Sequence, residues 1–478
     1  MAKDLENGAD YLSVGSPAPK EDSLQVPGRR NESAPFWTLV AISMPRMAIN
    51  MAWSAQWAAL GPYLSTMLPN YAVQLTQVIG PLVGIFFGPM IGTFSDRNTS
   101  KYGRRRPILA VGGALCIICW AFMSYTAQIG EALGDSGTGN ENRKATAAFT
   151  IIFYFWMDVM VTCCQTPSML LTADFAGDRQ TLGSSIGLAW AALGSIIVAV
   201  YIQIWGAAYL TLHYFMGMLC VVMAVSILVC CIFAKETPLD KTEVESGSTW
   251  QRAGQAVVDI FLGLKALPAQ LVSYAVILFF VLYGYSAYNG NKGQFFGLEV
   301  YDGVATNADS CGNNCTKQQI SFNDGVALAS GTGDLLFCIV GYLYALALPL
   351  LVKLIGAKWV LTVSMLPQAM LIIMAFCSNA AFDIFIAAII TCSQSAAFGL
   401  MVPVIIHVFG DDPNVNIGMY VGSLNAANCF GQLLNYAIGS ALVQTSLGYK
   451  LPILVGGIMS FLGFLVGAFF VKIKMYTM

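Results

Sequence analysis

Three charged residues interrupt long apolar stretches of the sequence, and they are the residues best placed to do chemistry. Arg46, Asp158 and Asp334 each lie about 13–16 Å from the start of their own stretch, at 1.5 Å per helical residue. Half the hydrocarbon core of a bilayer is about 15 Å thick, so all three fall near the middle of a membrane. A charge kept at that depth costs at least about 2.5–3.5 kcal/mol when unpaired, and indicates an ion, proton or substrate pathway.

The same three residues predict a proton-coupling site. Burial favours the protonated form of a carboxyl group and a nearby cation favours the ionised form. We therefore expect Arg46 to pair with Asp158, so that a change of access could load and release a proton. The structural alternatives are that Arg46 reaches to the membrane surface, that Asp158 is a neutral packing acid, and that Asp334 marks close packing beside Gly331 and Gly333.

Aromatic and amide side chains near these charges suit a sugar. A sugar needs many hydrogen-bond partners for its hydroxyls and flat aromatic faces for its C–H surfaces. The alternative is that these side chains form interfacial belts and hydrogen bonds between helices. The candidate substrate-binding residues are Trp53, Gln56, Trp190, Tyr283, Tyr288, Asn289, Asn425 and Gln432.

The composition indicates a protein embedded in lipid. Of the 478 residues, 56% are hydrophobic and 10% are charged, whereas soluble domains carry about 25% charged residues. The net charge of −2 gives no reason to expect nucleic acid as a partner. The two histidines, His213 and His407, lie in separate segments, and we find no cluster with metal-ligand spacing, no nucleophile–base motif and no Walker-type loop. We therefore expect no metal, no cofactor and no enzymatic activity.

Twelve apolar stretches are long enough to position these residues as membrane-spanning helices. Only helices satisfy every backbone group within a single segment in lipid. The expected spans are 37–64, 72–94, 107–127, 147–170, 182–206, 213–234, 270–290, 325–352, 359–379, 383–408, 416–445 and 451–472. The expected organisation is a disordered cytoplasmic tail at 1–36, a six-helix half at 37–234, a cytoplasmic linker at 235–269 and a second six-helix half at 270–478.

Charge and an internal repeat support this organisation. Of the 24 basic residues, 18 would fall on the side of both termini and five on the other, with Arg46 inside a span. The positive-inside rule then places both termini and the linker in the cytoplasm. Pro167, Gly183 and Gly187 recur as Pro403, Gly418 and Gly422 at offsets of 236, 235 and 235 residues, as expected for two parallel halves.

The connection between the second and third spans carries the densest charge in the chain. It runs from Gly92 to Pro107 and contains five basic residues, which at the least anchor a short cytoplasmic turn. A glycine at the helix end allows close approach of a neighbour, and an Asp–Arg pair beside it could latch the two halves together. The candidate gating residues are Gly92, Asp96, Arg97, Arg104, Arg105 and Asp174.

This basic connection resembles the signature of the major facilitator superfamily, in the lengthened form found in sucrose transporters and their glycoside–cation symporter relatives. Further stretches are similar to the same family, and together they cover most of the chain between Trp53 and Gln432. These stretches are Trp53 to Gln56, Gly61 to Tyr63, Asp158 to Pro167, Ala173 to Gly177, Phe296 to Gly303, and Gly418 to Gln432.

The resemblance implies the major facilitator fold and proton-coupled symport of sucrose or a related glycoside by a monomer. The chain departs from plant members at Thr181 and Ala327, where they carry arginines, and at Lys292 and Gln294, where acidic residues are expected. A facilitator or exchanger of another polar metabolite is the alternative, and a membrane sensor on a transporter fold is a further one. The expected site of action is the plasma membrane or an organelle membrane.

The polar loop 291–324, which the orientation places outside, contains two cysteines and a glycosylation pattern. Oxidising conditions there favour a disulfide between Cys311 and Cys315. Asn314 lies between them and heads the acceptor pattern Asn314-Cys315-Thr316, so glycosylation is the rival use of the same segment.

Overall fold

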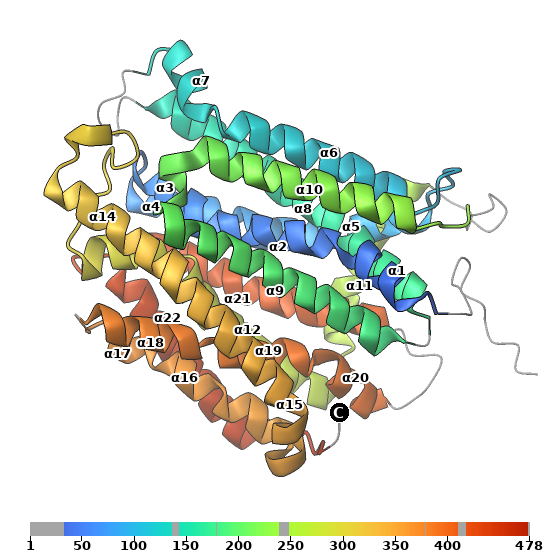
Figure 1. Ribbon diagram of the computed structural model, residues 1–478. Coiled ribbons are helices and arrows are strands. Elements are labelled where there is room, and N and C mark those ends of the chain that lie inside the picture. Colours follow the sequence, from blue (N-terminus) through green and yellow to red (C-terminus); the bar gives the residue numbers. More distant parts are fainter. Residues whose placement is uncertain are drawn as a thin grey trace, which may run out of the picture.

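The computed structural model describes residues 33–135, 143–177, 179–238, 248–377, 379–409 and 417–476. Every regular element within these ranges is a helix (Figure 1), so the expectation of an all-α protein is confirmed. Most of the expected N-terminal tail, at 1–32, lies outside the described residues, as do residues 239–247 of the expected linker.

The first half of the chain is built from ten α-helices, one π segment and one 3-10 turn. They are α1 (Phe36–Ser43), α2 (Pro45–Ala55), η1 (Gln56–Leu60), α3 (Gly61–Ser65), α4 (Asn70–Gln77), α5 (Ile79–Asp96), α6 (Arg106–Met123), α7 (Thr126–Ala132), α8 (Lys144–Ala176), α9 (Gln180–Trp205), η3 (Ala208–Thr211) and α10 (Leu212–Phe233). The first expected span is thus a continuous but irregular helix, because Pro45 and Pro62 each remove a backbone donor.

A linker helix and the second half follow. They are α11 (Thr249–Lys265), α12 (Ala269–Asn289), α13 (Lys292–Gln294), η5 (Phe295–Val300), η6 (Gly312–Asn314), α14 (Lys317–Ala327), η7 (Leu328–Gly333), α15 (Asp334–Val363), α16 (Met365–Ala369), α17 (Leu371–Met374), α18 (Ala380–Ile389), α19 (Thr391–Gly399), α20 (Met401–Phe409), α21 (Ile417–Leu442) and α22 (Lys450–Phe470).

Within the described residues, nine helices are long and apolar enough to cross a membrane. One of them, Lys317–Met374, has 58 residues and turns at Gly356, whose φ of 80° suits a residue without a side chain, so it contains two of the expected spans. The expected span at 37–64 is helical as well, and α21 covers 417–442 of the expected span at 416–445, although neither is among the nine. The count of twelve remains a prediction.

Helices of each half pack mainly against one another. In the first half α2 packs on α9 and α6 on α8, and in the second half α12 packs on α21 and α22. Small residues allow the close approaches: a Cβ at Gly194 would collide with the carbonyl oxygen of Met47, and one at Gly431 with that of Phe279. The two halves meet where α5 contacts α21 and where α9 contacts α15.

The bundle has two distinct ends (Figure 1). The end that carries α14 and residues 301–316, drawn on the left, is called the disulfide end here. The opposite end, which carries the start of α1 and the linker helix α11, is called the linker end. There α11 touches both halves: Trp250 packs edge-on against Phe94 of α5, and Ser423 of α21 donates to the carbonyl oxygen of Ile260 at 3.1 Å.

The structure corrects the expected loop at 291–324. The seventh span continues past Asn289 through α13 and the π segment η5, and α14 begins the eighth span at Lys317 instead of residue 325. Lys292, expected in an external loop, is 2% exposed inside the protein.

Candidate functional site

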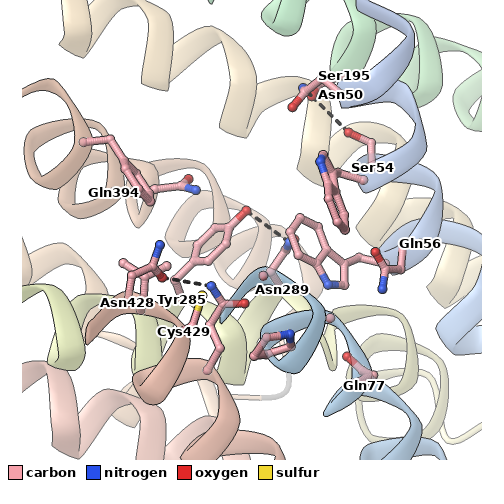
Figure 2. Close-up of a pocket in the computed structure, with 18 of the residues that line it drawn as sticks. Asn50, Ser54, Gln56, Gln77, Ser195, Tyr285, Asn289, Gln394, Asn428 and Cys429 are labelled. Atoms are coloured by element: carbon pink, nitrogen blue, oxygen red, sulfur yellow. Dashed lines mark hydrogen bonds between the residues drawn. The ribbon is translucent and has the colours of Figure 1, made fainter. Parts of the chain in front are cut away.

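A cavity of about 510 Å³ lies between the two halves near mid-length of the bundle. Its volume falls within the range of about 300–1,000 Å³ that is usual for small-molecule sites. Both halves contribute to its wall: Asn50, Ser54 and Ser195 face Tyr285 and the amides of the second half (Figure 2). Across the middle, the rings of Trp57 and Tyr285 meet edge to face at 6.0 Å.

The structure brings five of the eight candidate substrate-binding residues to this cavity: Trp53, Gln56, Asn289, Asn425 and Gln432. The other three do not line it. The indole of Trp190 donates to the carbonyl oxygen of Val40 at 2.9 Å, and Tyr283 and Tyr288 are each only 1% exposed within the second half. The sequence did not separate these three from the cavity residues, because residue type alone does not say which face of a helix a side chain occupies.

Several cavity residues escaped the sequence reasoning, although their spacing follows the helical repeat. Residues three, four or seven apart share one face of a helix. Three such runs line the cavity: Asn50, Trp53, Ser54 and Trp57; Tyr285, Asn289 and Lys292; and Asn425, Asn428, Gln432 and Tyr436. A search for polar residues at this spacing would have found them. Gln77, Gln165, Ser195 and Gln394 also line the cavity.

Hydrogen bonds fix the polar side chains of the first half. Asn50 donates to Ser195 Oγ at 2.5 Å and to the Ala191 carbonyl oxygen at 2.7 Å, and the indole of Trp53 donates to Gln165 Oε1 at 2.8 Å. Side chains held in this way meet a ligand without a large loss of conformational entropy.

Asp158 lies directly behind the cavity wall. Its residue is 0% exposed, and its Oδ2 accepts from Gln56 Nε2 at 3.3 Å. The same nitrogen donates to Tyr154 Oη at 2.5 Å. Asp158 Oδ1 and Gln56 Oε1 have no hydrogen-bond partner among the described residues. A Cβ on Gly80, which lines the cavity, would lie 3.6 Å from Asp158 Oδ2, so one layer of atoms separates this carboxyl from the cavity.

The expected ion pair between Arg46 and Asp158 is absent from the described residues. Arg46 lies ten residues before Gln56 on the same span, which is about 15 Å along a helix. Its guanidinium packs instead against Gly187 of α9, nearer the linker end. The side chain that contacts Asp158 is the amide of Gln56, at the same depth. The sequence did not indicate this partner, because a cation was expected and Arg46 is the only cation in the first span.

Lys292 and Asp334 form an ion pair in the cavity wall. Lys292 Nζ lies 2.5 Å from Asp334 Oδ1 and 2.6 Å from Oδ2, and it also donates to Asn289 Oδ1 at 2.8 Å. The side chains are 3% and 16% exposed. All three ammonium donors are thus used, and Asn289 in turn donates to Tyr285 Oη at 3.1 Å. The pair brings no net charge to the cavity.

The candidate gating residues gather at the linker end, but within one half. Arg105 lies 2.6 Å from Asp96 and 3.3 Å from Asp174, and Arg104 lies 2.8 Å from Asp174. The expected cross-half contact of Asp96 is therefore corrected: its ion pair is with Arg105 of its own half. Gly92 faces Thr166 of α8, also in the same half, where a Cβ would lie 3.6 Å from that side chain, and Arg97 ends α5.

Glu236 completes this cluster from the end of α10. Its carboxylate accepts from the backbone N–H groups of Arg105 and Arg106, between 2.9 and 3.1 Å, at the start of α6. A carboxylate at a helix N-terminus is a favourable arrangement. Burial nevertheless raises the pKa of Glu236, because the loss of water outweighs these hydrogen bonds.

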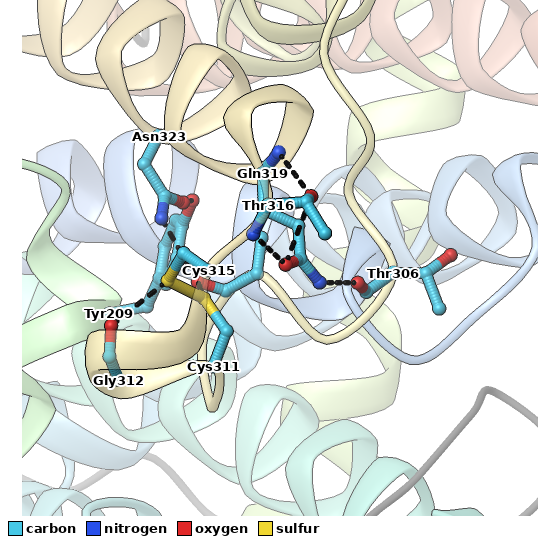
Figure 3. The surroundings of a disulfide bond; sticks show 9 residues. Tyr209, Thr306, Cys311, Gly312, Cys315, Thr316, Gln319 and Asn323 are labelled. Atoms are coloured by element: carbon cyan, nitrogen blue, oxygen red, sulfur yellow. Dashed lines mark hydrogen bonds between the residues drawn. A yellow bond between two sulfur atoms is a disulfide. The ribbon is translucent and has the colours of Figure 1, made fainter.

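At the disulfide end, Cys311 and Cys315 are joined by a disulfide, with Cα atoms 4.8 Å apart (Figure 3). Asn314 lies between them in the short turn η6 and is exposed. Thr316 caps α14: its Oγ1 accepts from the Gln319 N–H at 3.2 Å, and Gln319 Oε1 accepts from the Thr316 N–H at 2.9 Å. Within the described part of the chain, no group of three or more His, Cys, Asp and Glu could hold a metal ion.

Comparison with known proteins agrees with this architecture. A model of the family "MFS/sugar transport protein" matches residues 41–301, more than half of the chain. Sucrose transport protein SUT5 of Oryza sativa subsp. indica is 28% identical over 345 residues, which cover 66% of this chain and 61% of that protein. Sucrose transport protein SUC3 of Arabidopsis thaliana is 31% identical over 199 residues, which cover 40% and 33%.

Solved structures show the same fold. The nucleoside transporter NupG has a TM-score of 0.63 at 12% identity and covers 91% of this chain and 100% of its own. A D-xylose-proton symporter has a TM-score of 0.55 at 14% identity and covers 91% and 97%. With a matching family model over half its length and this fold, the chain belongs to the MFS/sugar transport protein family of the major facilitator superfamily.

Proposed function

We propose that this protein is a secondary transporter that carries a sugar or glycoside together with protons by alternating access. The proteins it resembles are transporters and not enzymes, and two of them are named for sucrose. The observation that carries the proposal is the central cavity, in which amides from both halves surround two indole rings. The alignment spans about three-fifths of the first relative, so the proposed substrate class is argued from the residues of the cavity.

The cavity suits a neutral, polyhydroxylated solute. Trp53 and Trp57 offer flat faces for C–H surfaces, and the amides both donate and accept hydrogen bonds, as hydroxyl groups do. The charges of Lys292 and Asp334 cancel within 2.6 Å. An anionic metabolite would meet no uncompensated positive charge here, and once Asp158 is protonated a cationic one would meet no negative charge, which favours a sugar over an ionic substrate.

Asp158 is the proposed proton-coupling residue, with Gln56 as its contact to the cavity. While Asp158 is ionised, Gln56 Nε2 donates to it, and Gln56 Oε1 is turned elsewhere without a partner among the described residues. When the cavity opens to the acidic side, a proton adds to a carboxylate oxygen of Asp158. Gln56 is then released to bond a substrate hydroxyl. Opening to the other side returns the proton to water. Asp334, already neutralised by Lys292, is the second candidate.

Orientation, membrane and assembly complete the proposal. The linker end faces the cytoplasm, with both termini there, in the plasma membrane or an organelle membrane, and the monomer is the transporting unit. The basic residues of the connection between α5 and α6, among them Arg104 and Arg105, support this orientation by the positive-inside rule. A facilitator or exchanger of another polar metabolite is the runner-up, favoured only if transport proves independent of pH.

The test is uptake of radiolabelled solutes into proteoliposomes, with and without an inward proton gradient, over a panel of sugars, glycosides, nucleosides and organic acids. Wild type should concentrate a sugar or glycoside only with the gradient. Asp158→Asn should abolish accumulation while exchange persists. The matched control is Asp383→Asn, an equally buried acid on α18 that does not line the cavity. Undiminished accumulation by Asp158→Asn would remove Asp158 from the coupling role, and accumulation of an organic acid alone would overturn the substrate class.

A further inference from the structure

Among the residues that the structure describes, the side-chain bonds that join the two halves directly are concentrated at the disulfide end. Arg143, at the start of α8, makes a bidentate ion pair with Asp309 of the segment 301–316, with both N–O distances at 2.8 Å. The two side chains are 5% and 6% exposed. A two-pronged bond between a guanidinium and a carboxylate is among the strongest and most directional contacts in proteins.

Backbone and side-chain contacts hold the segment 301–316 in place around this pair. The Asn307 N–H donates to the Thr66 carbonyl oxygen of the first half at 3.2 Å. Tyr209 of the first half donates to Asn323 Oδ1 at 2.5 Å, and Asn323 Nδ2 donates to the Ala308 carbonyl oxygen at 3.0 Å. Hydrogen bonds at Asn307 and Ala308 thus hold the chain directly before Asp309.

The disulfide lies next to this contact. Cys311 is two residues beyond Asp309, and its bond to Cys315 closes the turn that leads into α14. Figure 3 shows the disulfide beside Asn323 and Tyr209, which belong to opposite halves. A cross-link reduces the number of conformations open to the segment, and so keeps the Asp309 carboxylate in front of Arg143.

A second layer of contacts lies beneath the segment, over the cavity. Gln77, which lines the cavity, donates to the Gly290 carbonyl oxygen at 3.0 Å, and Gln74 donates to Asn291 Oδ1. Gln203 of α9 accepts from Thr332 at 2.8 Å. All of these bonds cross between the halves, so opening the cavity at this end requires that they break together.

We propose that the segment 301–316 is the gate of the disulfide end: Arg143 and Asp309 are its latch, and the Cys311–Cys315 disulfide positions the latch. The proposal rests on the alternating access of the proposed function. In the structure the latch is shut, and the bonds from Gln74 and Gln77 join the two halves between the latch and the cavity. When Arg143 and Asp309 separate and the bond between Gln77 and Gly290 breaks, the path from the outside to the cavity opens.

Two cysteines in the cavity wall, Cys338 and Cys429, report whether the gate is open. Cells that display the protein are treated with a membrane-impermeant maleimide, and mass spectrometry measures the labelling rate of each thiol. Wild type should label slowly. Asp309→Asn, which keeps the shape of the side chain, and Arg143→Gln should label about tenfold faster, since one charge-assisted pair of the closed state is lost. The exchanged pair, Arg143→Asp with Asp309→Arg, should return toward the wild-type rate.

Replacement of both Cys311 and Cys315 by serine should raise labelling less than Asp309→Asn does, because it loosens the latch without removing it. The matched control is Lys450→Gln, which removes an ion pair with Glu299, 3.9 Å away, at the same end but within one half. Its labelling should equal that of wild type. Surface quantity and thermal stability of each variant exclude misfolding, and Asp309→Asn decides the question if Arg143→Gln fails to reach the surface.

Labelling does not depend on transport, so the two proposals fail separately. Fast labelling of wild type, or unchanged labelling in both Asp309→Asn and Arg143→Gln, overturns the gate whatever is transported. Labelling that responds as expected, in a protein that moves no solute of the panel, leaves the gate standing and removes the proposed function.

Discussion

Replacing Lys292 by methionine should destabilise the protein through Asp334. Methionine keeps the length of the side chain but removes the ammonium group, which leaves a carboxylate in the cavity wall without its cation. Breaking a buried ion pair from one side costs about 3–5 kcal/mol. Asp334 is 16% exposed and reaches the cavity, so we expect the lower end of this range, about 3 kcal/mol, because water there recovers part of the loss.

The assay is a double-mutant cycle on purified protein in detergent, with thermal unfolding followed by tryptophan fluorescence. Lys292→Met and Asp334→Leu should each lower the unfolding midpoint clearly. The double variant should unfold nearer wild type than either single variant, because replacement of both members of a buried pair by apolar groups is often close to neutral. As a control, Lys450→Gln breaks a pair whose lysine is 36% exposed and should cost only about 0–1 kcal/mol.

Additive losses in the double variant would refute the reasoning. They would mean that the two side chains act independently, and that the ammonium group of Lys292 serves Asn289 alone.

Three further results are expected. Gly194→Val should prevent correct assembly, seen as loss of the monodisperse peak in size-exclusion chromatography, because a Cβ there meets the backbone of α2; Gly217→Val, where a Cβ meets open space, should behave as wild type. Asp174→Asn should lower the free energy of unfolding by about 1–3 kcal/mol, because Arg104 and Arg105 lose the carboxylate that they share. Substrate preference in uptake assays should be unchanged. Partial burial raises the pKa of Asp135, but hydrogen bonds from the start of α8 outweigh it and lower this pKa below its ordinary value of 3.8. The ionised carboxylate therefore stabilises the folded protein above that value, and this stabilisation is lost as the pH falls through the lowered pKa. On acidification below about pH 4, the unfolding midpoint of wild type should fall more than that of Asp135→Asn.

The spans were predictable because their signal is local. Apolar length alone located helices at each expected stretch, since lipid leaves the backbone no other choice. The end of the seventh span was not predictable. Residues 289–294 read Asn-Gly-Asn-Lys-Gly-Gln, a typical loop composition, yet the helix continues because Lys292 finds Asp334, 42 positions later, and no local pattern contains that partner.

The candidate site was partly predictable for a related reason. Asn289, Asn425 and Gln432 reach the cavity because each belongs to a run of polar residues on one helix face. Tyr283 and Tyr288 can also form hydrogen bonds, but they lie on other faces of α12, the helix that carries Asn289, and are buried there. The partner of Asp158 depended on depth: Arg46 lies in the right span, but about 15 Å along the helix from Gln56, the residue that contacts the carboxyl group.

The cap of α14 has a consequence for the order of events while the chain is being made. In the folded segment the hydroxyl of Thr316 is committed to the Gln319 N–H, and Cys315 is fixed by its disulfide, although both belong to the acceptor pattern headed by Asn314. If Asn314 is glycosylated, the sugar would therefore have to be attached while this segment is still extended. Disulfide formation and glycosylation would then compete while the chain is being made. The fraction of chains that carry a sugar at Asn314 would depend on how fast residues 311–319 fold.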